Sequence, residues 1–284
     1  MGILKTITEE YFGDTIRKED EIDIEGLDVE IVSFTDNNGN IHRRGYKPKD
    51  KKILKKLLKR MIKVRGDEGD FNDIDTSDIT DMSFLFDEKE RFNGDISGWD
   101  VSNVENMEFM FNKARSFNQP IGKWRFPKCK NLTQMFSCAY SFNQPIGEWE
   151  FPNVVTLESM FAAEDYDFER MNFNQPIGNW KFPKVENMRA MFANCYVFNQ
   201  PIEKWEFPKC SNMCFMFFNA IRFNQPIGNW DVSNVKDMNG MFEEADSFNQ
   251  DLSKWNLIGK ETINMFDNCP IKKEYKPKMK PNIE

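Results

Sequence analysis

The chain has one histidine and six cysteines, the first residues to consider for catalysis or metal binding. A Ser-His-Asp or Cys-His site would have to use His42, and a metal site would have no second imidazole. The cysteines form no C-x-x-C pair, and Cys129 and Cys210 occupy a position that valine holds elsewhere in the chain. We therefore expect a surface histidine, reduced cysteines packed as small core residues, and neither a catalytic site nor a cofactor.

Acidic residues are dense between Asp67 and Asp81, which suggests a cation site as a second kind of chemistry. Their spacing does not match the calcium-loop pattern D-x-[DN]-x-[DN]-G-x5-E. We expect these carboxylates to pair with polar groups of a capping region and to form no dedicated metal site, although weak cation binding stays open. The sequence also contains no glycine-rich phosphate-binding loop.

The net charge of −8 and the isoelectric point near 5.1 argue against a protein that binds nucleic acid directly, because such proteins carry a basic face. No apolar run is long enough to cross a membrane. The N-terminus lacks the pattern of a secretory signal, so the sequence alone predicts a cytoplasmic protein. We expect a monomer whose partner is another protein of unknown identity.

A repeated unit organises the rest of the chain. Consecutive tryptophans are 25 residues apart, with one spacing of 31, and they stand at Trp99, Trp124, Trp149, Trp180, Trp205, Trp230 and Trp255. Each unit reads F-N-Q-P-I-G-x-W-x-[FV], followed by apolar residues that include M-x-x-M-F. A fixed period of this length is typical of stacked repeats. The spacing I-x-x-W-x-F-x-x-C resembles the L-x-x-L-x-L-x-x-N/C signature of leucine-rich repeats.

The predicted fold class is an α/β repeat, a right-handed leucine-rich-repeat-like solenoid with a small N-terminal α+β cap. Each unit is expected to contain one short parallel strand around Trp124 and Phe126 and one short helix, because apolar residues follow at steps of three and four over 104–114. The asparagine of Phe-Asn-Gln is expected to form a buried ladder between successive loops. The expected domains are a leader of a helix and a β-hairpin (1–45), an amphipathic capping helix (46–70), the solenoid (71–269) and a Lys/Pro-rich tail (270–284).

The strings FNGDISGWDVSNVENM and FNQPIGNWDVSNVKDM resemble the BspA-like leucine-rich repeats of bacterial surface proteins and mycoplasma lipoproteins. The segment that begins YKPKDKKILKKLL resembles the N-terminal cap of such arrays, and FDNCPIKKEYKPK resembles their last unit. The resemblance covers about residues 46–280. It implies a leucine-rich-repeat fold and a location at the cell surface.

Two surfaces are candidates for binding a partner. In a strand, the residues that flank each tryptophan point away from the core, and they vary while the frame stays fixed. The candidates in this row are Lys123, Arg125, Glu148, Glu150, Lys181, Lys204, Glu206 and Asp231. The second surface is the insertion at 162–172, where Asp165, Tyr166 and Phe168 combine acids with aromatic anchors.

The sequence therefore predicts a non-enzymatic protein-binding module that uses the concave face of the solenoid and the acidic-aromatic insertion. Two other functions remain open. The resemblance implies a secreted or surface adhesin that binds host macromolecules. The acidic body and the lack of a signal suggest an intracellular inhibitor, encoded by a phage or mobile element, that blocks the basic groove of a host defence nuclease.

Overall fold

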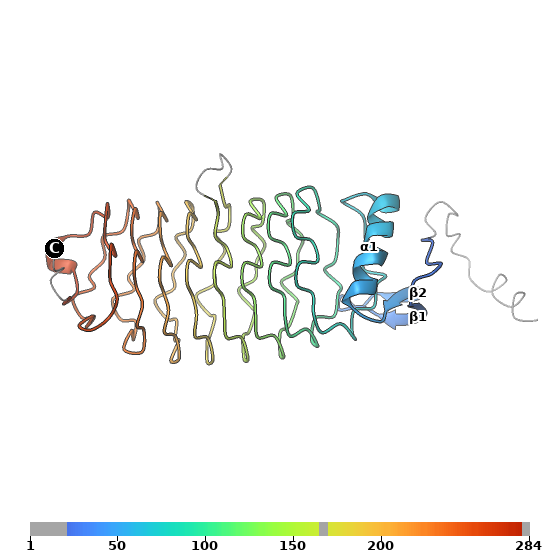
Figure 1. Ribbon diagram of the computed structural model, residues 1–284, viewed down its shortest axis with the longest axis horizontal. Helices are drawn as coiled ribbons and strands as arrows, with labels where there is room; N and C mark the ends of the chain where they lie inside the picture. The colour runs from blue at the N-terminus through green and yellow to red at the C-terminus, as the bar shows by residue number, and fades with distance from the viewer. Residues whose placement is uncertain (1–21, 165–169, 280–284) are drawn as a thin grey trace, which may run out of the picture.

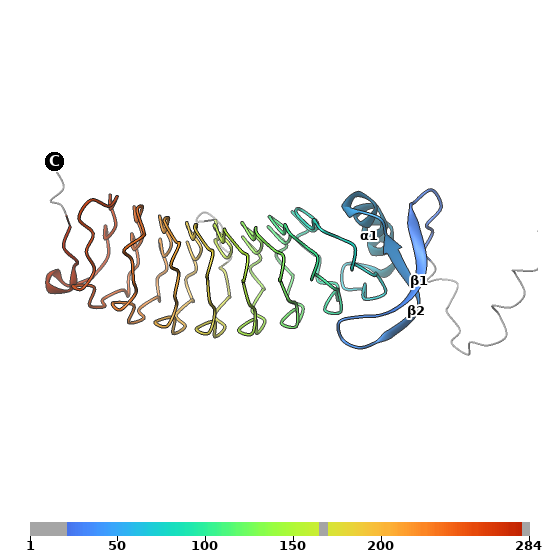
Figure 2. The ribbon, with the colours of Figure 1, turned by 90° about the horizontal axis from the view of Figure 1, so that it is seen from below.

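The computed structural model describes residues 22–164 and 170–279. Its regular elements are the strands β1 (Val29–Thr35) and β2 (Ile41–Pro48), the helix α1 (Lys51–Arg65) and the short 3-10 helix η2 (Lys273–Tyr275). The strands β1 and β2 pair antiparallel around the segment 36–40. Between α1 and η2 the chain forms a series of coils that stack along the long axis of the molecule (Figures 1 and 2).

Helix α1 lies across the N-terminal end of this stack (Figure 1). The carboxylate of Asp50 caps the helix by accepting a hydrogen bond from the Ile53 N–H, and Gly66 ends it with a φ of 79°. The leucines and methionine on one face are fully buried against the first coil, whereas the lysines on the other face are half-buried or exposed. The amphipathic sequence of α1 therefore covers the apolar end of the stack.

Successive coils are joined by a ladder of parallel bridges. The bridged residues recur once per coil: Asp81, Asn106, Asn131, Thr156, Asn187, Asn212, Asp237 and Glu261. In the stretch of one coil that begins at residue 106, the N–H groups of Met107, Phe109, Phe111 and Lys113 donate to carbonyls of the next coil at 2.8–3.0 Å. We call residues 106–113 and their counterparts in the other coils the ladder segments.

The ladder segments correct the secondary structure expected for each unit. Every second N–H bonds to the next coil, and the N–H groups between them close local turns, as Met110 does to the Met107 carbonyl. Phe109 and Lys113 have φ values of 55° and 57°, which interrupt a right-handed helix. Within the described residues no coil contains a helix, so the helix predicted over 104–114 is wrong.

The strand predicted around Trp124 is also absent, because the Trp124 N–H closes a turn to the Ile121 carbonyl. The continuous inter-coil ladder lies on the segment that was expected to be helical. The side chains that flank each tryptophan are consequently not displayed on a concave β-sheet.

Large aromatic side chains form continuous stacks through the core. Phe111 lies 3.9 Å from Phe117 and 5.5 Å from Phe136, between ring centroids, and the three rings are nearly parallel. The Trp180 and Trp205 rings stack at 6.3 Å, and the Trp205 Nε1–H donates to the Ile177 carbonyl of the preceding coil at 2.9 Å. Each coil thus buries its apolar face against its neighbours, as a repeat unit of this length requires.

The asparagines of the Phe-Asn-Gln loops form the ladder that the sequence predicts. The Asn143 side-chain oxygen accepts the Asn174 N–H at 3.0 Å, and the same arrangement recurs along the stack. These asparagines are half-buried, and Asn199 is exposed, so the expectation of a buried ladder is wrong in that respect.

All six cysteines are free, and all but the half-buried Cys269 are buried. This confirms the prediction that they pack as small core residues.

Candidate functional site

The residues that flank each tryptophan form an exposed row along the stack. We call this the Trp-flanking row, and it consists of the pairs Lys123 and Arg125, Glu148 and Glu150, Asn179 and Lys181, Lys204 and Glu206, Asn229 and Asp231, and Lys254 and Asn256. Every one of these side chains is exposed, whereas the tryptophan between each pair is buried. The alternation expected from the sequence is therefore present, although it is carried by turns rather than by a strand.

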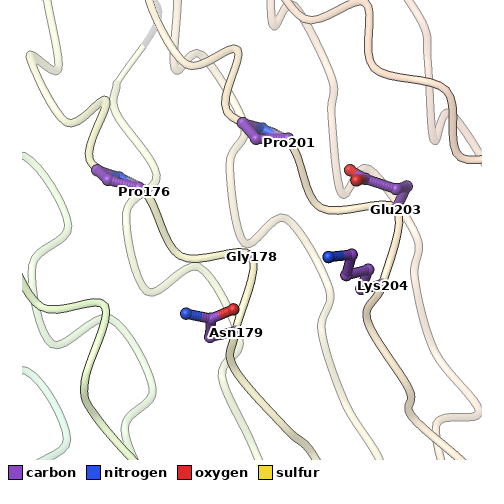
Figure 3. A pocket seen from close by; sticks show the side chains of 6 residues that line it. All are labelled: Pro176, Gly178, Asn179, Pro201, Glu203 and Lys204. Carbon is purple, nitrogen blue, oxygen red and sulfur yellow. The ribbon is translucent and has the colours of Figure 1, made fainter.

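Two adjacent hollows lie along the C-terminal half of this row. The smaller has a volume of about 200 Å³ and is lined by Pro176, Gly178, Asn179, Pro201, Glu203 and Lys204. Figure 3 shows that these six residues come from two neighbouring coils. The larger has a volume of about 420 Å³ and is lined by Glu203, Lys204, Trp205, Glu206, Phe207, Pro208, Asn229, Asp231 and Asn234. We call the larger hollow the groove.

Glu203 gives one physical reason for the groove. The equivalent position is glycine in neighbouring coils, and a Cβ there would lie 2.6 Å from a carbonyl of the next coil at Gly147 and Gly178, and 2.1 Å at Gly228. Atoms cannot approach so closely without a shift of the backbone. A coil with Glu203 must therefore sit differently against the next coil, which starts at Phe223, than the glycine-containing coils do.

A change in core side chains gives a second reason. The position two residues after each tryptophan holds phenylalanine in four consecutive coils, ending at Phe207, and valine at Val232. The Phe151 and Phe182 rings stack at 6.0 Å, but Phe207 has no such ring beyond it. Phe207 lines the groove, and the buried Val232 of the next coil fills less volume than the phenylalanines of the preceding coils.

The groove carries a net negative charge. Glu203, Glu206 and Asp231 line it against the single cation of Lys204. Hydrogen bonds from the side chain and backbone of Ser233 lower the pKa of Asp231, so this carboxyl stays ionised at neutral pH. The amides of Asn229 and Asn234 add neutral donors and acceptors beside these carboxylates. The arrangement suits a cationic side chain that needs carboxylate acceptors above an aromatic floor.

The insertion candidates Asp165, Tyr166 and Phe168 lie outside the described residues. On the preceding side of the insertion, Lys113 forms an ion pair with Glu164 at 2.8 Å. On the following side, the Arg170 guanidinium lies 5.1 Å from the centre of the Tyr196 ring.

His42 is half-buried, so the prediction of a surface histidine is wrong in that respect. Its Nε2 lies 2.9 Å from the Asp36 carboxylate, whose side chain is fully buried. Burial alone would raise the pKa of Asp36, but hydrogen bonds from His42, Asn40 and Asn38 lower it below its ordinary value. The sequence Asp-Asn-Asn-Gly-Asn at 36–40 predicts the turn of a hairpin, but it gave no sign that Asp36 would be buried against His42.

The turn at 36–40 packs against the first coil, at the end of the Trp-flanking row. The Asn37 N–H donates to the Gly98 carbonyl at 2.8 Å, and Lys123 reaches the Asn38 side-chain oxygen at 3.2 Å. The row thus begins at the hairpin.

The acidic stretch between Asp67 and Asp81 pairs with basic residues of the N-terminal elements. Arg65 binds both oxygens of Asp73 at 2.7 Å, and Lys51 reaches Asp81 at 3.0 Å. No group of three or more potential metal ligands occurs within the described parts of the chain. These carboxylates hold β2 and α1 against the first coils.

The family models match residues 55–169 and, in a second tandem copy, residues 164–278. The chain belongs to the family described as Mycoplasma protein of unknown function, DUF285. The two matches of this DUF285 chain extend from α1 to the end of the stack. No curated protein and no solved structure matches it. Among the residues that the structure describes, no helix combines the length and apolar character needed to cross a bilayer.

Proposed function

We propose that this DUF285 protein is a non-enzymatic protein-binding module, and that its contact surface is the Trp-flanking row with the groove at its C-terminal half. One observation carries the proposal: exposed residues that differ from coil to coil flank a fixed frame of buried tryptophans. A rigid frame with variable exposed positions is the usual construction of a recognition surface in repeat proteins.

The groove supplies the anchor point on this surface. Its carboxylates Glu203, Glu206 and Asp231 fit a lysine or arginine of the partner, and the edges of Trp205 and Phe207 provide apolar contact to the aliphatic part of that side chain. The rest of the row, which alternates in charge from Arg125 to Glu150 to Lys181, fixes the register of the partner.

The test is a fourfold charge reversal on the row, Arg125→Glu, Glu150→Lys, Lys181→Glu and Glu206→Lys. Affinity purification from the cell that naturally makes the protein identifies the partner, and titration with the purified partner then measures affinity. We expect the variant to lose binding by at least about a hundredfold. The matched control reverses four exposed charges outside the row: Glu186, Lys209, Lys236 and Asp246. Equal affinity of both variants would contradict the proposal.

We further propose that the stack is a right-handed leucine-rich-repeat-like solenoid of the BspA-like type, with the adhesin role as the second candidate function. The repeated strings FNGDISGWDVSNVENM and FNQPIGNWDVSNVKDM support this proposal. Surface exposure is tested by labelling intact cells with a biotin reagent that does not cross membranes. Labelling equal to that of a known surface protein is expected for an adhesin, and labelling no higher than that of a cytosolic protein excludes it.

A further inference from the structure

The last ladder segment, residues 261–268, has hydrogen-bond partners on one side only. Its carbonyls accept from Met238, Gly240, Phe242 and Glu244 of the preceding coil at 2.8–3.0 Å. Its own outward N–H groups, those of Thr262, Asn264, Phe266 and Asn268, have no hydrogen-bond partner among the described residues. In the preceding coils the equivalent groups all donate to the next coil. We call this row of four N–H groups the donor edge.

The segment that follows covers the donor edge only at Phe266, which is buried and has the Lys276 ammonium 5.4 Å from its ring centre. Residues 270–279 return instead along the preceding Trp segment, where the Leu252 N–H donates to the Tyr275 carbonyl and Leu257 donates to Lys278. At the opposite end of the stack, α1 lies against the first ladder segment, and its Lys51 bonds to Asp81 and Ser83. One end of the ladder is therefore covered by a helix, and the other is covered only at Phe266 within the described chain.

The side chains around the donor edge point to the chemistry of an occupant. Ile263 is 66% exposed and Ile258 is 59% exposed, in a protein whose other coil isoleucines, from Ile74 to Ile227, are nearly all fully buried. Glu261 and Asp267 are exposed on the same segment. The edge thus combines backbone donors, an apolar contact and negative charge.

Within the described residues, the ladder of a second folded copy does not supply the acceptors that this edge needs. Its own donor edge brings N–H groups only, and its acceptor end lies under α1. We propose that the donor edge binds an extended segment of a partner protein, aligned parallel to residues 261–268. This segment offers a backbone carbonyl at every second residue, an apolar side chain to Ile263 and basic side chains to Glu261 and Asp267. This is strand addition to a ladder whose polarity is fixed, and it does not depend on the Trp-flanking row.

A peptide with the sequence of residues 103–116, NVENMEFMFNKARS, is a suitable probe. Within the protein, the carbonyls of Asn106, Glu108, Met110 and Asn112 accept from the preceding coil at 2.9 Å, which is the role required at the donor edge. Because Asn106, Glu108 and Asn112 lie opposite Glu261, Ile263 and Asp267 in the register of the ladder, the peptide is made with Asn106→Lys, Glu108→Leu and Asn112→Lys. Hydrogen exchange of the full-length protein is measured with and without the peptide at roughly millimolar concentration.

We expect the amides of 262, 264, 266 and 268 to exchange rapidly in the free protein and to slow by at least about tenfold with the peptide. Ile263→Asp should weaken peptide binding by about tenfold, while the matched control Ile41→Asp, at a 74% exposed isoleucine of β2, leaves it unchanged. N-methylation of the peptide at Met107 and Phe111 should preserve binding, because these N–H groups face away from the protein.

Three results would overturn the proposal: no protection of these four amides at millimolar peptide, equal binding by the two isoleucine variants, or loss of binding on N-methylation. None of these results bears on the charge-reversal test of the Trp-flanking row. The two proposals therefore fail separately.

Discussion

Gly147→Ala tests whether the glycine that stands two residues before the tryptophan in four of the coils sets the distance between coils. The added Cβ would lie 2.6 Å from the Pro176 carbonyl oxygen, whereas ordinary contact begins near 3.4 Å. The position of a Cβ is fixed by the backbone, and the carbonyl oxygen is part of the backbone, so neither atom can move as the end of a flexible side chain could. The two coils must separate by about 0.8 Å at this point, at the expense of the neighbouring Asn143–Asn174 hydrogen bond.

The expected cost follows from this displacement. Forcing a methyl group into a packed interior destabilises a protein by about 1–3 kcal/mol. Gly147 does not have a positive φ, so alanine adopts its backbone conformation and gains about 0.4–1 kcal/mol from the unfolded chain. The net loss is about 1–2 kcal/mol, which lowers the melting temperature by about 2–8 °C in a chain of this size.

The measurement is thermal and urea unfolding of the Gly147→Ala variant beside Glu203→Ala. Glu203 occupies the same position in its own coil, where a Cβ is already present, so truncation to alanine should change stability by less than about 0.5 kcal/mol. If the two variants unfold at the same temperature, the close approach does not govern the stack, and the account of the groove fails with it.

Three further outcomes follow from buried and bridging groups. Burial raises the pKa of the Cys129 and Cys210 thiols to about 12, so neither thiol should react with a thiol reagent below pH 9 in the folded protein. The urea midpoint should fall as pH rises above 9, because these thiols ionise there in the unfolded chain but not in the folded one. The pKa of Asp36 is lowered, so the stability that its carboxylate provides is present above about pH 4 and is lost as the pH falls further. Limited proteolysis should show that the hairpin loosens below about pH 4, and that Asp36→Asn loosens it already at neutral pH. Asn143→Ala removes the acceptor for the Asn174 N–H and should lower the free energy of unfolding by about 1–2 kcal/mol in urea titrations. The control Asn179→Ala, at an exposed side chain, should lower it by less.

The sequence was informative where a residue type has one physical role. Tryptophan at a fixed interval placed Trp124 and its counterparts in the core, and the exposed residues on either side follow from alternation. The Asn143 ladder could be inferred because a polar residue repeated at every turn can bond to its own copies.

The helix prediction failed because apolar steps of three and four also arise from consecutive turns. Every ladder segment has two residues in the left-handed region except 156–163, which has only Ser159, and at one of these positions Phe84, Phe109 and Phe215 adopt it despite their bulk. Side chains with a Cβ disfavour that conformation, so the phenylalanines gave no sign of it. A weak signal existed in Gly240 and in Asn194, which occupy the two left-handed positions in other coils.

The groove could not be predicted, because it depends on the distance between coils. The substitution at Glu203 is visible in FNQPIEKW beside FNQPIGNW. The effect of this substitution is visible only in the structure, where the carbonyls of Pro176, Pro201 and Asp251 lie close to the glycines at the equivalent position in other coils.

The one-way direction of the ladder ties these observations to the charge distribution. Within the ladder segments the inter-coil N–H groups point toward the C-terminal end and their accepting carbonyls toward the N-terminal end, whereas bonds outside them, such as that from the Lys130 N–H to the Glu105 carbonyl, run the other way. The ladder segments therefore have aligned peptide dipoles with the positive end at the donor edge. Cations belong at the acceptor end, where Lys51 and Lys55 of α1 lie, and anions at the donor end, where Glu261 and Asp267 are exposed. With the acceptor end covered, copies of the chain cannot add head to tail. A partner strand at the donor edge should therefore bind in a ratio of one per chain rather than seed a filament.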